Sequence, residues 1–218
     1  MSQSLIETLP PAQRLALAYT PARMKPPTLA LLALEARLAE AIRQASEPIM
    51  AQMRLAWWRD QLLLSPDRRE NSDELMHALA GFEGEEEALR KLVDGWELLL
   101  SEWIDPPSIE RMVAGRAAGF AALARLAGRG DAVDAATQAG RRFALADLAT
   151  KFSNAEERAQ VLEHAASSGD KRIALPVELR SLALLDGLAR RSLSKGGTPL
   201  LNGPGSALHA IRLGLWGH

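Results

Sequence analysis

Acidic side chains are the residues of this chain that could bind a divalent metal ion, and their spacing decides whether they can cooperate. Residues four apart on a helix point the same way, so two carboxylates at that spacing can share Mg²⁺, which prefers oxygen ligands. Glu35 and Glu40 are five apart, or about 140° around a helix. Asp147 is followed four residues later by Lys151 instead of an acid. These acids predict no shared metal site, and we assign no catalytic residue.

Other groups with metal-binding or nucleophilic chemistry are scarce. Asp131 and Asp134 follow a glycine-rich turn, where helix capping explains them. Asp94 and Glu97 fit surface or packing roles on one helix. The chain has no cysteine, which excludes thiolate chemistry, and its four histidines are not spaced as a metal pair on a helix. We therefore expect no metal ligand set.

The most distinctive segment is 46–60, which reads SEPIMAQMRLAWWRD. Pro48 suits the first turn of a helix, where its missing N–H costs nothing. Glu47 precedes it, where a carboxylate can meet the exposed N–H groups and the positive end of the helix dipole. The segment therefore predicts a helix that starts at Pro48.

Large side chains follow one another along this predicted helix. Met50, Met53 and Trp57 fall on one face at spacings of three and four, and Arg54 and Trp58 share a neighbouring face. One interpretation is a core helix with two aromatic side chains and an arginine stacked on an indole. The other is a ligand site, and the residue pattern leaves both open.

The same residues resemble a known signature. Glu47-Pro48, followed by the run from Arg54 to Arg59, is similar to the "SEP…RLxWWR" motif of the squalene/phytoene synthase family. Weaker resemblance covers most of the chain, at residues 13–45, 93–97, 114–126 and 172–176. It implies an all-α fold of the isoprenoid synthase type, a single helical bundle around a central cavity, with residues 1–218 as one domain.

The resemblance also implies which reaction to expect. Active members condense two allylic diphosphates and hold Mg²⁺ with two aspartate-rich motifs. These motifs would fall near residues 35–43 and 144–156, and neither segment carries the paired acids. The chain thus looks more like a degenerate, non-catalytic branch of the family, which is associated with assembly of respiratory complex I.

This reading implies a binding role without a cofactor. The ligand would be a prenyl chain or another lipid, and the partner a respiratory-complex protein. Arg54 could then anchor an anionic head group, with Trp57 and Trp58 beside the apolar chain, while Glu47, Pro48 and Arg59 complete the motif.

Two alternatives remain open. The first is a Mg²⁺-dependent prenyl transferase that acts on allylic diphosphates in isoprenoid biosynthesis through a relocated metal site. Mg²⁺ is expected only in that case. The second is a helical scaffold with no cavity at all.

The elements that must position these residues are predicted to be helices. Alanine and leucine dominate, and segments rich in β-branched residues are nearly absent. Ser108 is expected to cap one helix after Pro106-Pro107. Proline and glycine clusters then divide the chain into predicted helices at residues 11–19, 27–46, 48–64, 72–81, 85–104, 108–127, 131–151, 154–167, 177–194 and 205–214.

Composition and charge restrict the function class and location. The 218 residues carry 26 Lys and Arg against 27 Asp and Glu, a balance that argues against a nucleic-acid partner. Neither a signal peptide nor a run of about 20 apolar residues is expected. These features predict a cytoplasmic protein, with peripheral contact to the inner membrane through an amphipathic surface at 205–216 as a further option.

Overall fold

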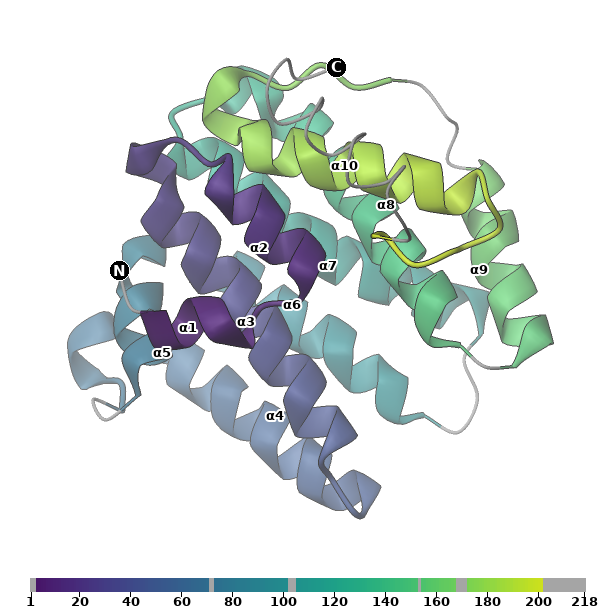
Figure 1. Ribbon diagram of the computed structural model, residues 1–218. Coiled ribbons are helices and arrows are strands. Elements are labelled where there is room, and N and C mark those ends of the chain that lie inside the picture. Colours follow the sequence, from purple (N-terminus) through teal and green to yellow (C-terminus); the bar gives the residue numbers. More distant parts are fainter. Residues whose placement is uncertain (1–2, 71–72, 102–104, 153, 168–171, 202–218) are drawn as a thin grey trace.

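The chain folds into helices throughout the part that the structure describes. The computed structural model describes residues 3–70, 73–101, 105–152, 154–167 and 172–201. No strand occurs in these ranges (Figure 1), which confirms the predicted all-α class. The α-helices are α1 (Gln3–Thr8), α2 (Pro11–Ala18), α3 (Lys25–Arg43), α4 (Pro48–Leu63), α5 (Glu74–Ala78), α6 (Glu86–Glu97), α7 (Pro106–Leu126), α8 (Val133–Lys151), α9 (Ala155–Ser167) and α10 (Arg180–Leu193).

Prolines lie in the first turn of four of these helices, α2, α3, α4 and α7. α4 starts at Pro48 as predicted, but α3 and α7 start earlier than expected because their proline pairs lie inside the first turn. The prediction that Ser108 caps α7 is wrong. The carboxylate of Asp105 is the cap and accepts a hydrogen bond of 2.8 Å from the Ser108 backbone N–H.

Other boundaries also differ from the predicted ones. α6 ends at Glu97, where a 3₁₀ turn replaces the expected longer helix. The short helix α1 was not predicted, because six residues show too little periodicity. The predicted helix at 205–214 and the amphipathic surface at 205–216 lie outside the described residues.

The long helix α7 packs between α6 and α8, and α10 packs on the other side of α8 (Figure 1). Small residues make this close packing possible. A Cβ atom at Gly115 would lie 2.3 Å from the Lys91 carbonyl oxygen of α6, and one at Gly140 of α8 would lie 2.8 Å from the Ala117 Cα of α7. Gly115 and Gly140 therefore allow α7 to pack closely against α6 and α8.

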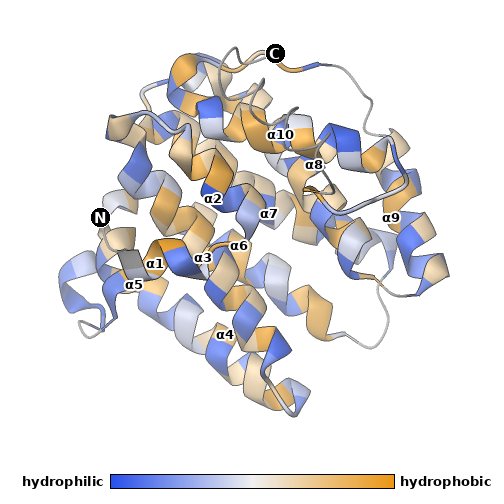
Figure 2. Ribbon diagram, in the orientation of Figure 1, coloured by the Kyte–Doolittle hydropathy of each residue, from blue (hydrophilic) through white to orange (hydrophobic). Residues whose placement is uncertain are grey.

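Apolar side chains fill the space between the helices. The main core cluster draws residues from every α-helix except α9 and includes the stacked rings of Phe120 and Phe143, whose centroids are 5.6 Å apart. A smaller cluster joins α7, α8 and α9. α4 forms an edge of the bundle and carries hydrophobic residues along its length (Figure 2). Among the described residues, no helix has the length and hydrophobicity needed to cross a bilayer.

Candidate functional site

A buried arginine joins the two acidic positions that the sequence singled out. The Arg116 guanidinium of α7 donates hydrogen bonds from Nε and Nη2 to the Glu35 carboxylate of α3, at 3.2 and 2.9 Å. Its Nη1 donates to Asp147 Oδ2 of α8 at 2.7 Å. The side chains of Arg116 and Glu35 are only 1% and 2% exposed. Three helices are thus connected through one guanidinium.

Aromatic rings enclose the same guanidinium. Its Cζ lies 5.2 Å from the centroid of Trp96 and 5.1 Å from that of Phe143. Lys151 Nζ lies 4.7 Å from the Trp96 ring and donates a hydrogen bond of 2.7 Å to Asp147. The indole therefore contacts two cations, the buried Arg116 and the exposed Lys151, and the contact with Arg116 is strengthened because that guanidinium is weakly solvated.

The charges in this cluster stabilise one another. Burial alone would lower the pKa of the Arg116 guanidinium, but Glu35 and Asp147 raise it above its ordinary value. Burial would raise the pKa of the Asp147 carboxyl, but Arg116 and Lys151 hold it below its ordinary value. Both groups are therefore charged at neutral pH, as a buried ion network requires.

The arrangement of acids does not suit a divalent metal ion. Glu35 faces Arg116 in the core, whereas Glu40 accepts a hydrogen bond from Gln44 on another face of α3. The predicted divergence of these two acids is confirmed. In the part of the chain that the structure describes, no three Asp, Glu or His side chains converge on a point where they could hold a metal.

Sequence reasoning missed Arg116 and Trp96. Arg116 is the only charged residue between positions 112 and 124, a run that is otherwise small and apolar. A lone arginine in such a run indicates a buried cation, and a buried cation needs a buried acid as its partner. That signal could have identified Arg116, but the identity of its partners depends on the packing of α3 and α8 against α7.

The residues of the distinctive segment lie elsewhere, along a groove between α3 and α4. The groove has a volume of about 600 Å³. Its walls are Arg37, Glu40 and Ala41 from α3, the C-cap residue Gln44, Met50, Met53, Arg54, Trp57 and Trp58 from α4, and Asp73. The three predicted ligand-binding residues are therefore brought together at one surface groove.

The two tryptophans of this groove differ in their environment. Trp58 is 3% exposed and belongs to the main core, whereas Trp57 is 38% exposed. Their rings pack edge to face, with centroids 5.0 Å apart. Trp58 thus anchors α4 in the bundle and presents Trp57 at the groove.

Arg54 is exposed and stacks on neither indole. In the described ranges it has no hydrogen-bond or ion-pair partner, and the cations that contact an indole there are Arg116 and Lys151, both on Trp96. The sequence interpretation of an arginine stacked on an indole of this segment is therefore wrong. Arg54 instead offers a free guanidinium at the edge of the groove.

The remaining motif residues have structural roles. Glu47 occupies the N-cap position of α4 with extended backbone, but its side chain accepts no capping hydrogen bond, and Pro48 follows at the first helical position. Arg59 pairs with Asp94, at 2.7 Å, and with Glu97 of α6. Arg59 therefore holds α4 against α6, beside the groove.

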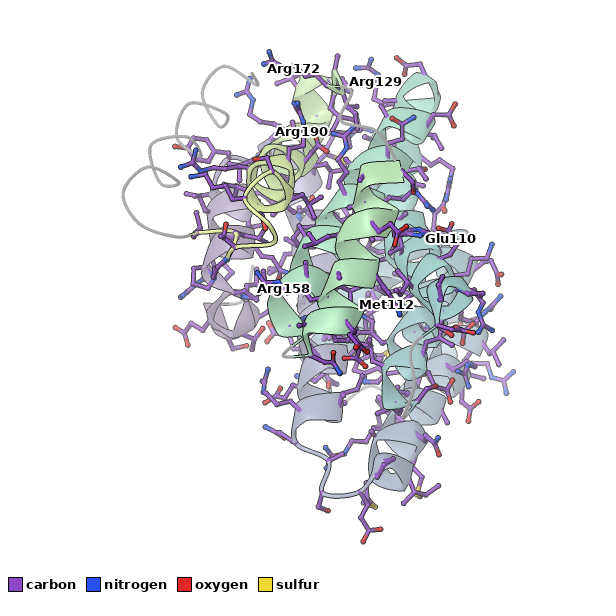
Figure 3. All side chains as sticks on the ribbon, turned by 90° about the vertical axis from the view of Figure 1, so that its right-hand side faces the viewer. Glu110, Met112, Arg129, Arg158, Arg172 and Arg190 are labelled. Atoms are coloured by element: carbon purple, nitrogen blue, oxygen red, sulfur yellow. The ribbon has the colours of Figure 1, made fainter. Side chains whose placement is uncertain are left out.

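A second ionic cluster attaches α9 to the bundle. Glu110 of α7 accepts two hydrogen bonds of 2.7 Å from Arg141, and its Oε2 lies 2.8 Å from His164 Nε2. Figure 3 shows Glu110 beside α9. The Arg141 side chain, and to a smaller extent His164, lowers the pKa of the Glu110 carboxyl. This cluster is an ordinary helix contact and adds no reactive group.

Two features thus stand out as sites: the buried Arg116 cluster and the exposed groove with its free cation. The Arg116 cluster can hold helices together, but its carboxylates are already occupied by cations. The groove can bind a ligand that has an apolar part and an anionic group, with the anionic group at Arg54. Comparisons with protein-family models, curated proteins and solved structures find no match to this chain.

Proposed function

We propose that this chain is a non-catalytic helical protein of the squalene/phytoene synthase type, with an isoprenoid-synthase-like bundle, which binds an amphiphilic ligand or a partner protein. The observation that carries the proposal is that Arg116 forms ion pairs with both Glu35 and Asp147. The resemblance in segment 46–60 supplies the family, and the cytoplasmic location proposed for the chain agrees with its composition.

The Arg116 cluster supports a non-catalytic role through simple electrostatics. In an active synthase, Mg²⁺ would stabilise the departing diphosphate as a Lewis acid. Here the acids at the two corresponding positions are neutralised by a guanidinium that is itself buried. Binding Mg²⁺ at those acids would leave the Arg116 cation buried and unpaired, which costs several kcal/mol.

The groove between α3 and α4 supports a binding role. Its volume of about 600 Å³ falls within the usual range of ligand sites, and thioether and indole groups form much of its wall. Arg54 could hold a phosphate or carboxylate head group at its edge, while Trp57 contacts the apolar chain. A prenyl phosphate or another anionic lipid has this chemistry.

The catalytic alternative has a direct test. The purified chain is incubated with farnesyl or geranylgeranyl diphosphate and Mg²⁺, and diphosphate release is measured. We expect no release above the level without protein. Mg²⁺-dependent turnover that disappears in Glu35→Gln and Asp147→Asn would overturn the proposal and establish a prenyl transferase.

Ligand binding is tested separately by tryptophan fluorescence during titration with geranylgeranyl monophosphate. Arg54→Ala should weaken binding, whereas Arg125→Ala, which removes a surface arginine paired with Glu85, should not. Equal binding by both variants would show that the groove is not the ligand site. Deletion of the gene followed by measurement of complex I activity tests the assembly role that the resemblance implies.

A further inference from the structure

The exposed large hydrophobic side chains of the described residues are concentrated on α4. Five of the six lie on this one helix: Ile49, Met50, Met53, Trp57 and Leu63. The first four form a continuous stripe with spacings of one, three and four residues, over about 12 Å of helix. We call this stripe, together with Arg54, the α4 face. A clustered apolar surface of this kind is typical of an interaction site.

The α4 face is larger than the groove beneath it. Ile49 is 54% exposed and lies outside the groove wall, and Met53 is 63% exposed although it lines the groove. A single lipid chain in the groove would leave these side chains in water. A helix laid along α4 would cover them, because anchors at i, i+3, i+4 and i+7 match the spacing of the stripe. Methionine also adapts its shape to a docked surface.

Charge defines the chemistry of the partner. Arg37 pairs with Asp73, and Glu40 accepts a hydrogen bond from Gln44. Among the charged residues that line the described groove, this leaves Arg54 as the one without a partner. A partner that carries a carboxylate beside its own apolar stripe complements this surface, because it forms an ion pair with Arg54 and an apolar contact with the stripe at the same time.

The charge balance of α4 favours a protein over a lipid surface. The helix and its cap carry two cations, Arg54 and Arg59, and two acids, Glu47 and Asp60. A helix that binds anionic membranes needs an excess of cations beside its apolar side. A second copy of the chain would add a second unpaired Arg54 beside the same stripe, and this like charge disfavours self-association.

We infer that the α4 face binds an amphipathic helix of a partner protein. The apolar side of that helix covers Met50, Met53 and Trp57. An Asp or Glu at the border of its apolar side binds Arg54. This inference rests on the binding role proposed above and specifies its partner.

The test is a selection of helical peptides from a display library against the full chain. Enriched peptides should carry apolar residues at i, i+3 or i+4 and i+7, with an acid at the border. Arg54→Glu should change the preferred border residue from Asp or Glu to Lys or Arg. Enrichment without the apolar pattern, or with a border residue indifferent to Arg54→Glu, would overturn the inference.

Matched variants locate the binding surface. Met53→Glu should lower the affinity of an enriched acidic peptide at least about tenfold, because it places a charge in the centre of the interface. Leu63→Glu is the control, since Leu63 lies on the same helix at 62% exposure but outside the groove. It should leave the affinity unchanged. Equal losses in the two variants would contradict the proposed surface.

Two further measurements distinguish other occupants. Sedimentation with phosphatidylcholine–phosphatidylglycerol vesicles tests a membrane, and light scattering of the pure chain tests self-association. The inference would be overturned if the chain binds vesicles or associates with itself, if Met53→Glu abolishes that process, and if no peptide binds the α4 face. Turnover of allylic diphosphates would instead overturn the proposed function and leave the peptide result intact. Binding of geranylgeranyl monophosphate without peptide enrichment would overturn the inference and leave the proposed function intact.

Discussion

Arg116 and Glu35 are 81 positions apart in the sequence but form a two-point ion pair in the core, with hydrogen bonds of 3.2 and 2.9 Å to the two carboxylate oxygens. The planar guanidinium fork matches a carboxylate in this way, and its third nitrogen is free to bind Asp147. Two carboxylates from different helices are thereby held by one side chain, which an ammonium group could not do with the same geometry.

Replacement of Arg116 should be among the most destabilising changes in the protein. Arg116→Met leaves two largely buried carboxylates without their shared cation, so we expect a loss of about 3–5 kcal/mol in the free energy of unfolding. Urea denaturation measures it. Arg125→Met is the control, because Arg125 makes a similar fork with Glu85 at the surface and should cost less than about 1 kcal/mol. Similar losses for the two variants would contradict the buried network.

Removal of the whole network should cost less than removal of its centre. The triple variant Glu35→Leu, Arg116→Met, Asp147→Leu leaves no unpaired buried charge. We therefore expect it to be more stable than Arg116→Met alone, as shown by the midpoint of urea denaturation. A triple variant less stable than the single one would mean that the three side chains do not act as a charge-compensated unit.

Acid should weaken the fold through Asp147. Arg116 and Lys151 outweigh the effect of burial and hold the pKa of its carboxyl below the unfolded value of about 3.9. As the pH falls, the unfolded state therefore binds the proton first, so this contribution is complete above about pH 5 and is lost progressively until the pH has fallen through the folded pKa. Denaturation curves from pH 6 to pH 2 should show a smaller pH dependence for Asp147→Asn. An unchanged slope would exclude this origin of acid sensitivity.

The two adjacent tryptophans should behave differently. Trp58→Ala removes a buried core side chain and should cost about 3–5 kcal/mol in the free energy of unfolding. Trp57→Ala acts at the groove surface and should cost about 1 kcal/mol. Binding of an enriched acidic peptide should depend on Trp57, whereas the free energy of unfolding should depend mainly on Trp58. The reverse order of stability losses would show that the environments of the two rings are interchanged.

Close packing of α6 and α7 can be tested at Gly115. A Cβ there would lie 2.3 Å from the Lys91 carbonyl oxygen, so Gly115→Ala forces the helices apart and should cost about 1–3 kcal/mol, measured by thermal unfolding. Gly81→Ala is the control, because a Cβ at Gly81 has no atom within 4 Å among the described residues, and its stability should hardly change. Tolerance of alanine at Gly115 would contradict the helix spacing.

Local features of the fold were predictable, and their boundaries less so. Periodicity and breakers predicted the helices, since both depend on residues close in sequence. α3 and α7 start two residues before their predicted positions, because a proline that ends one helix is also accepted in the first turn of the next. Trp57 and Trp58 could not be separated into groove and core from one helix alone, since their burial depends on the helices packed around α4.

Local sequence was enough to establish that the chain is helical, that segment 46–60 starts a helix at Pro48, and that Glu35 and Glu40 point apart. These are properties of local backbone geometry and side-chain spacing. The packing of the helices established that Glu35 and Asp147 share Arg116, and that Arg54 lies at an apolar face without a partner among the described residues. The pairing of charges from α3, α7 and α8 depends on how the helices pack, because burial sets which ions must find a partner and distance sets which partner they find.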